Sequence, residues 1–191
     1  MTSWRARALF ARMWLRQNKR FYADPAAMRD GLPWHQEPKR ARPPRRITAK
    51  YQVTCQEVDG RPVYTLTPPG GPSSPWHIFH MHGGGFVESP EPHHWRFAGR
   101  IVAQTGCTYT LPMYPLAPEN DHRAIIPMVE RAYDRVTRET APGNRIVFGD
   151  SAGGTLALTL ARHLHERGQP QPRPWRCSPR GSIWPPTIRC R

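Results

Sequence analysis

Hydrophobic and polar positions follow a regular order from Tyr51 onward, which predicts short strands separated by amphipathic helices. Apolar runs of strand length fall near residues 51–57, 62–66, 76–81, 108–113 and 145–148. Helical periodicity falls near residues 93–106, 123–140 and 155–167. Strands that alternate with helices indicate an α/β fold with a largely parallel sheet, in which ligands bind beyond the carboxyl ends of the strands.

The two ends of the chain have a different pattern. Residues 4–22 alternate large apolar side chains with arginine at a helical spacing, which suits either a cap over a binding site or a helix on an anionic membrane surface. Residues 38–46 are charged and interrupted by proline, and we interpret them as a solvated linker. The predicted division is an N-terminal helical and linker segment at 1–50, an α/β domain at 51–170 and a disordered tail at 171–191.

The net charge of +14 comes from the ends of the 191-residue chain. Residues 1–50 hold 13 Lys and Arg against 3 Asp and Glu, whereas residues 51–167 hold 10 against 11. Because the central segment is almost neutral, we expect no nucleic-acid partner. Contact of the basic end with a membrane surface, through residues 1–22, is expected to be weak.

Cysteine and histidine positions do not indicate a metal site or another cofactor. The four cysteines lack paired spacing, and we expect free thiols at Cys55, Cys107, Cys177 and Cys190. His93 and His94 open a predicted helix, where adjacent side chains point apart, so a surface or substrate-side role is expected. His77 and His80 lie on an apolar strand and are expected in the core. Arginines interrupt the N-terminal apolar residues, unlike a secretory signal, and the expected location is cytoplasmic.

A serine between glycines is the most informative feature of the chain. The stretch Gly149–Gly154 reads G-D-S-A-G-G and lies between an apolar strand and an apolar helix. That context distinguishes a nucleophile elbow from a chance match to G-x-S-x-G. A side chain at Gly149 or Gly153 would collide with neighbouring backbone in so sharp a turn, while Ser151 is left exposed. The pattern therefore predicts Ser151 as a catalytic nucleophile.

A second glycine motif precedes the serine. The stretch His82–Phe86 reads H-G-G-G-F and follows the apolar run at 76–81. Bare backbone N–H groups in such a loop stabilise the oxyanion of a tetrahedral acyl intermediate, and glycine lets the backbone approach the substrate closely. The two motifs in this order are far more specific than either alone.

With the run Tyr114–Glu119, these motifs resemble the hormone-sensitive-lipase-like family of serine carboxylesterases, within the α/β-hydrolases, over residues 50–170. The resemblance implies the N-terminal part of an α/β-hydrolase fold, incomplete at the C-terminus, that hydrolyses a small acyl ester without a cofactor. It implies Ser151 as the nucleophile, with supporting residues His82, Asp150 and Glu119. It assigns the oxyanion hole to the amide of Ala152 and to two of the amides of Gly83, Gly84 and Gly85.

The acid and the histidine that activate the serine in this fold follow it along the chain. After Ser151 the sequence holds one acidic residue, Glu166, and two histidines, His163 and His165. All three lie on the helix that begins at the serine, where His163 would be about 18 Å away at 1.5 Å per residue. We expect these histidines to be exposed and without a catalytic role, and residues 1–191 to have little or no turnover.

An abrupt change of composition coincides with the missing partners. From Arg173 onward, prolines and arginines stand where the fold requires another buried strand. Codons compatible with this tail, read in a shifted frame, permit the string A-L-A-L-L-S-P-W-L-D-L-A, which ends in the S-P-W-x-D-L pattern of the resembled family. We interpret the tail as out of frame and expect strand 145–148 to be an exposed sheet edge. The alternatives are a non-catalytic fragment with a binding role and a basic protein that associates with membranes or nucleic acid.

Overall fold

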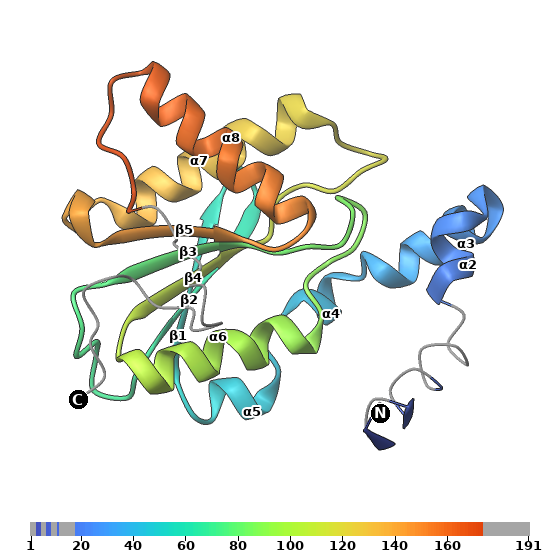
Figure 1. Ribbon diagram of the computed structural model, residues 1–191, viewed down its shortest axis with the longest axis horizontal. Helices are drawn as coiled ribbons and strands as arrows, with labels where there is room; N and C mark the ends of the chain where they lie inside the picture. Colours follow the sequence, from blue (N-terminus) through green and yellow to red (C-terminus); the bar gives the residue numbers. More distant parts are fainter. Residues whose placement is uncertain (1–2, 5–6, 9–10, 12–17, 174–191) are drawn as a thin grey trace.

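A five-stranded sheet forms the centre of the computed structural model, which describes residues 3–4, 7–8, 11 and 18–173 (Figure 1). The strands lie in the order β1-β2-β4-β3-β5. Their bounds are β1 (Gln52–Val58), β2 (Arg61–Thr67), β3 (His77–Met81), β4 (Thr108–Pro112) and β5 (Arg145–Gly149). Strand β3 is parallel to β4 and β5, and β2 is antiparallel to β1 and β4. Only β2 therefore runs against the others, which confirms the predicted α/β class and the mostly parallel sheet.

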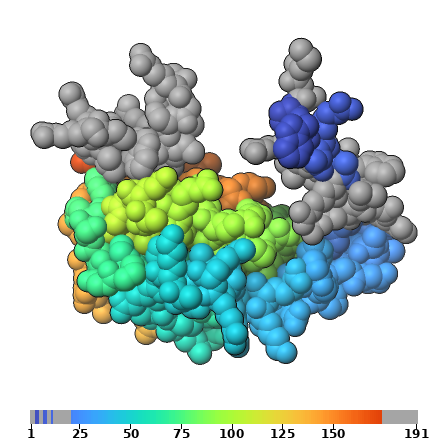
Figure 2. All heavy atoms as spheres, turned by 90° about the horizontal axis from the view of Figure 1, so that it is seen from below, coloured from blue at the N-terminus to red at the C-terminus, as the bar shows by residue number. Residues whose placement is uncertain are grey.

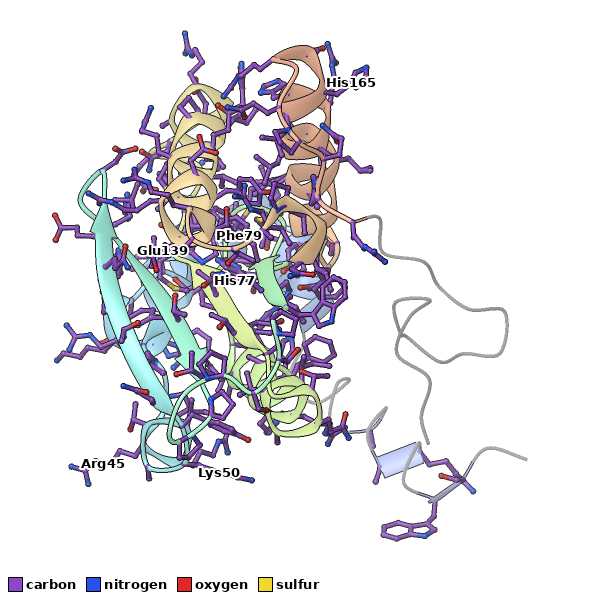
Figure 3. The ribbon with its side chains drawn as sticks, turned by 90° about the vertical axis from the view of Figure 1, so that its left-hand side faces the viewer. Arg45, Lys50, His77, Phe79, Glu139 and His165 are labelled. Carbon is purple, nitrogen blue, oxygen red and sulfur yellow. The ribbon has the colours of Figure 1, made fainter. Side chains whose placement is uncertain are left out.

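Helices cover both faces of the sheet (Figure 1). Helices α7 (His122–Thr137) and α8 (Ala152–Glu166) lie on one face, and α6 (Pro92–Thr105) lies on the other. A short 3₁₀ turn, η1 (Pro142–Asn144), precedes β5. The buried strand β3 serves both cores because its side chains alternate: Phe79 packs with α7 and α8, whereas Ile78 packs with α6. Phe79 lies between the sheet and the helices near the centre of the molecule (Figure 3).

From residue 18 to the sheet, the chain forms four short helices: α2 (Asn18–Ala23), α3 (Pro25–His35), α4 (Pro38–Ala41) and α5 (Arg45–Thr48). Figure 2 shows its blue part as an extension on one side of the body. The predicted amphipathic helix at 4–22 falls largely outside the described residues, as does the predicted tail beyond Arg173.

The linker interpretation of residues 38–46 needs a correction. Their charged side chains are exposed, but the stretch forms α4 and the start of α5, and Ala41 is buried in the cluster that α6 covers. Ile47 joins the same cluster, and the Tyr51 hydroxyl donates to the buried carbonyl of Gly99 at 2.6 Å. The small Ala41 side chain fits this contact, which the charge pattern does not reveal. Ala41, Ile47 and Tyr51, the buried side chains of residues 41–51, therefore belong to the core.

An ion-pair cluster joins α7 to α8 and corrects the expectation for His163. The Nδ1 atom of His163 lies 2.5 Å from Glu130, whose carboxylate also pairs with Arg167. His163 is therefore partly buried and paired, because it lies on the side of α8 that faces α7. His165 is exposed at the far end of α8, as expected (Figure 3).

Strand β5 forms one edge of the described sheet, as predicted. Among the described residues, Arg173 alone pairs with the outer side of β5. It forms a parallel bridge with Ile146, and its amide donates to the Arg145 carbonyl at 2.8 Å. The position that a further parallel strand would occupy thus begins at Arg173, where the composition changes.

Thiols and membrane spans are described for only part of the chain. Cys55 and Cys107 are free, as predicted, whereas Cys177 and Cys190 lie outside the described residues. Of the helices in the described ranges, none is both long enough and apolar enough to cross a membrane.

Replacing Tyr51 by Phe tests the contact between the N-terminal segment and the core. The substitution removes the hydroxyl that donates to the buried Gly99 carbonyl, which keeps the amide bond within α6, so we expect the free energy of unfolding to fall by about 0.5–1.5 kcal/mol. Urea unfolding measures this loss. Tyr22→Phe removes an exposed hydroxyl bond and is the matched control, with a smaller expected loss. Equal losses in the two variants would contradict the core assignment of residues 41–51.

Candidate active site

The turn from β5 into α8 has the geometry of a strained elbow. Ser151 precedes α8 with φ 51° and ψ −121°, a region that residues with a side chain rarely adopt. A Cβ atom on Gly149 would overlap the Gly153 carbonyl, and one on Gly153 would overlap the Met81 carbonyl at the end of β3. Backbone on both sides of the turn thus excludes side chains at these two glycines, and Ser151 is exposed at the tip.

The glycine loop lies directly against this elbow. A Cβ atom on Gly83 would overlap the Asp150 carboxylate, so the loop and the residue before Ser151 are in van der Waals contact. Gly84 has a φ of 124°, which only glycine adopts readily. The amides of Gly84 and Gly85 donate no hydrogen bond to another group in the described ranges. The Ala152 amide opens α8, where backbone N–H groups have no partner within the helix.

A cavity of about 900 Å³ joins the two motifs to the N-terminal helices. Its floor contains Ser151, Asp150 and the three loop glycines. Side chains of α2 and α3 line the same cavity, among them Phe21, Tyr22, Trp34 and His35. The start of α6 adds His93 and His94. The α2–α3 pair therefore borders the space in front of the serine.

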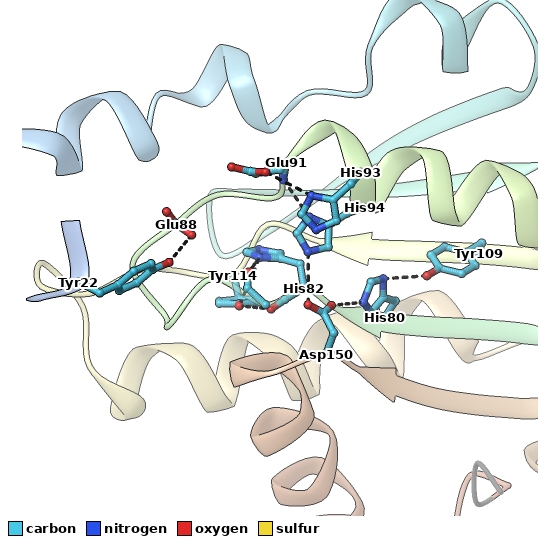
Figure 4. A network of polar contacts seen from close by, with 11 residues as sticks. Tyr22, His80, His82, Glu88, Glu91, His93, His94, Tyr109, Tyr114 and Asp150 are labelled. Atoms are coloured by element: carbon cyan, nitrogen blue, oxygen red, sulfur yellow. Dashed lines mark hydrogen bonds and ion pairs between the residues drawn. The ribbon is translucent and has the colours of Figure 1, made fainter. Parts of the chain in front are cut away.

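Several polar contacts hold α2 and α3 beside the glycine loop. The Tyr22 hydroxyl donates to Glu88 at 2.6 Å (Figure 4). His35 Nδ1 lies 2.9 Å from the same carboxylate. The Gln36 side-chain amide donates to the carbonyls of Val87 at 3.0 Å and Ala117 at 2.6 Å. Gln36 thereby connects the end of α3 to two loops that border the site.

The Asp150 carboxylate is the centre of a network of buried polar groups (Figure 4). His80 Nε2 lies 2.8 Å from its Oδ1 atom, and His80 Nδ1 lies 2.7 Å from the Tyr109 hydroxyl. Partial burial raises the pKa of Asp150, but the bonds from His80 and His94 outweigh it and hold this pKa well below its ordinary value. An ionised carboxylate only accepts, so His80 Nε2 carries the proton that it donates.

His94 is a site residue that the sequence interpretation placed only in part. Its ring is buried against Asp150, with Nε2 3.5 Å from Oδ2, and its Nδ1 accepts the Glu91 amide at 2.9 Å. His93 is exposed, yet the two rings lie 3.9 Å apart, so the expectation that they point apart is wrong. The cause is a capping box in which His94 turns back to Glu91 at the start of α6. The Glu91-to-His94 spacing was the available signal.

His82 is buried behind the glycine loop. Its Nδ1 donates to the Gly83 carbonyl at 2.9 Å, and its ring stacks on Tyr114, whose hydroxyl donates to the His82 carbonyl at 2.6 Å. Burial lowers the pKa of His82 to about 3, so its ring is neutral at physiological pH. His77 and His80 are buried as expected, but His80 also takes part in the site.

Glu119 lies apart from the serine. Its side chain is exposed and makes no hydrogen bond or ion pair with the described residues. It lines a second cavity of about 520 Å³, together with His82 and Tyr114. The structure thus brings Ser151, Asp150, Ala152, His82 and the glycine loop together, whereas Glu119 borders the other side of His82.

Known proteins resemble this chain in sequence and fold. Residues 78–183 match the family model described as the alpha/beta hydrolase fold, which is more than half of the chain. The solved structures that resemble it include an esterase from the bacterial hormone-sensitive lipase family, 28% identical with a TM-score of 0.57, covering 64% of this chain and 41% of that one. The chain belongs to the hormone-sensitive-lipase-like α/β-hydrolases.

Curated relatives of this hydrolase chain include a lipase and an esterase. A triacylglycerol lipase of Mycobacterium tuberculosis is 33% identical over 63% of this chain and 27% of its own length. An esterase of Acinetobacter venetianus is 30% identical over 50% of this chain and 32% of its own length. The hydrolase chain therefore spans about a third or less of these two relatives and about two fifths of the solved structure.

Alanine substitution at two adjacent glycines tests the elbow geometry. Gly153→Ala places a methyl group against the Met81 carbonyl, and we expect a loss of several kcal/mol in the free energy of unfolding. Gly154→Ala meets only ordinary contacts and should be neutral or stabilising by up to about 1 kcal/mol, because alanine favours the helix. Urea unfolding distinguishes the two. Equal effects at both positions would contradict the close approach at Gly153.

Asp150→Asn tests the charge of the network through pH. The pKa of Asp150 is depressed in the folded state, so its stabilising effect is present above the unfolded value of about 3.9 and is lost as the pH falls toward the folded value. We expect the variant to be less stable than the parent at pH 7 and the difference to shrink below about pH 4. Urea unfolding at several pH values measures this. A deficit that stays constant down to pH 3 would rule out an ionised Asp150.

Proposed function

We propose that this chain carries the nucleophile half of a serine ester hydrolase that acts on acyl esters. The observation that carries the proposal is the exposed Ser151 at a strained, positive φ, in a cavity that it shares with the glycine loop. Relatives named as lipases and esterases support the substrate class. The proposed roles are nucleophile for Ser151, oxyanion donors for Ala152 and two of Gly83–Gly85, and support for His82, Asp150 and Glu119.

In the proposed reaction, Ser151 Oγ bonds to the ester carbonyl carbon, and the carbonyl π electrons move to its oxygen. Amides of the glycine loop and of Ala152 donate to this oxyanion, and the N-terminus of α8 adds a favourable dipole. The tetrahedral intermediate collapses to an acyl-serine and expels the alkoxide, which takes up the serine proton. Water then releases the acid. Proton transfer in both steps requires a general base.

The two histidines that face Asp150 are not free to serve as that base, whereas His35 and His93, which also line the cavity, pair with Glu88 and Glu91 through Nδ1. Both ring nitrogens of His80 already face partners, Tyr109 and Asp150. His94 is engaged by the Glu91 amide and faces Asp150, and His163 pairs with Glu130 on α7. These contacts support the proposal that residues 1–191 lack the acid and histidine of the triad.

We further propose that the tail from Arg173 is out of frame. The parallel bridge of Arg173 to β5 supports this, because the next strand of the fold would start there. The family model matches as far as residue 183, beyond Arg173. The proposed frame change at Arg173 therefore rests on the change of composition there and not on where the family match ends. The domain division at 1–50, 51–170 and 171–191, the cytoplasmic location and the weak membrane contact of residues 1–22 stay predictions.

Hydrolysis of p-nitrophenyl butyrate tests the proposed function. Four proteins are compared: residues 1–191, a protein continued from residue 172 in the shifted frame of the source DNA, and the Ser151→Ala variant of each. We expect residues 1–191 to retain at most the roughly 10³–10⁴-fold effect over water that remains without a triad. The continued protein should gain a large rate that Ser151→Ala abolishes. A large Ser151-dependent rate from residues 1–191 alone would refute the missing-triad proposal.

A further inference from the structure

His80 occupies a place in the site that neither its strand nor its neighbours in sequence explain. It lies on β3, two residues before the glycine motif, and is about 1% exposed. Its ring packs against Phe148 on β5, with centroids 4.7 Å apart, and against Phe97 on α6. A phenyl ring would suit these apolar contacts equally well. The imidazole differs by its two nitrogens, and both have partners.

One ring nitrogen of His80 donates a hydrogen bond, and the other accepts one. Nε2 lies 2.8 Å from Asp150 Oδ1 and must donate, because an ionised carboxylate can only accept. Nδ1 lies 2.7 Å from the hydroxyl of Tyr109, a fully buried residue of β4. Burial lowers the pKa of His80, which favours the neutral ring, so Nδ1 accepts from the Tyr109 hydroxyl. Tyr109 therefore fixes the tautomer that donates to Asp150.

Asp150, which accepts from His80, contacts both the glycine loop and the turn that carries Ser151. It is covalently next to Ser151, and its carboxylate fills the space in which a side chain on Gly83 would lie. His94, from α6, faces the second carboxylate oxygen at 3.5 Å. Rotation of the Asp150 side chain would thus remove the side-chain part of the contact between the glycine loop and the elbow, although the Asp150 carbonyl would still lie against Gly83. Only His80 holds it by a bond of normal hydrogen-bond length among the described side chains.

We propose that His80 is a positioning residue: as a neutral donor fixed by Tyr109, it orients the Asp150 carboxylate and thereby holds the glycine loop at a fixed distance from Ser151. The inference rests on the proposed function only for the identity of the nucleophile. Because its test does not require catalytic turnover, the positioning role of His80 can be refuted while the proposed hydrolase function holds, and the reverse.

His77 provides a matched control on the same strand. It is also buried and also uses both ring nitrogens, which face Thr110 at 2.8 Å and Thr140 at 3.3 Å. It begins β3, at the end opposite to the glycine loop. Loss of its ring nitrogens removes comparable buried hydrogen bonds without touching Asp150.

The experiment uses NMR on residues 1–191 and four variants: His80→Phe, His80→Gln, Tyr109→Phe and His77→Phe. The readouts are the pH titration of the Asp150 carboxyl carbon and the amide shifts of Gly83, Gly84 and Ala152. In His80→Phe we expect the Asp150 midpoint to rise by about one pH unit or more and the three amides to shift. His80→Gln, which keeps a donor, should restore much of both signals.

The remaining variants separate positioning from general stability. Tyr109→Phe should shift the Asp150 titration less than His80→Phe does, and it also decides the question if His80→Phe does not fold. His77→Phe should lower the melting temperature but leave the Asp150 titration and the loop amides unchanged. The proposal is overturned if His80→Phe or Tyr109→Phe leaves Asp150 and the loop unaltered, or if His77→Phe alters them equally.

Discussion

The close approach of Gly153 to the end of β3 is the constraint on which the site depends. Because no side chain intervenes, the first turn of α8 lies on the Met81 carbonyl. The same approach brings the residue before the serine against the loop that leaves β3. The strained backbone of Ser151 persists because packing on both sides of the turn determines it. Two motifs that lie 67 residues apart in sequence thereby form one surface.

Polar contacts then hold the elbow and the glycine loop in the close packing that the glycines permit. The carboxylate of Asp150 accepts from β3 and faces α6, so three elements of the fold converge on the residue beside Ser151. Each histidine of this cluster has a tautomer set by its neighbours rather than by solvent. Such imidazoles hold geometry, but they do not supply the mobile proton acceptor that a serine hydrolase needs. This is the basis of the proposal that the site positions Ser151 without a base.

Much of the fold could be predicted from the sequence, because strand and helix periods are strong where both faces are buried. The strands at 76–81 and 145–148 and the helices around them lie within three residues of their predicted bounds. The steric need for Gly149 and Gly153 also followed from the motif, since a tight turn admits few residue types. Both the strand and helix periods and the glycine motif depend on residues that lie close together in the sequence, so they could be predicted from it.

The parts that sequence could not give depend on contacts between distant segments. Nothing near His80 indicates that Tyr109 and Asp150 would face its two nitrogens, and Ala41 is buried only because α4 reaches the cluster under α6. His163 was misplaced for the same reason, since its partner Glu130 lies on another helix.

The most direct measurement is the rate at which a fluorophosphonate labels Ser151 under native conditions, with Ser151→Ala as the blank. Labelling requires both an exposed serine and a base that removes its proton. A preformed elbow without a base predicts slow labelling of residues 1–191 and labelling faster by orders of magnitude in the protein continued through the shifted frame. Rapid, Ser151-dependent labelling of residues 1–191 would show that a base is already present and would contradict the half-site.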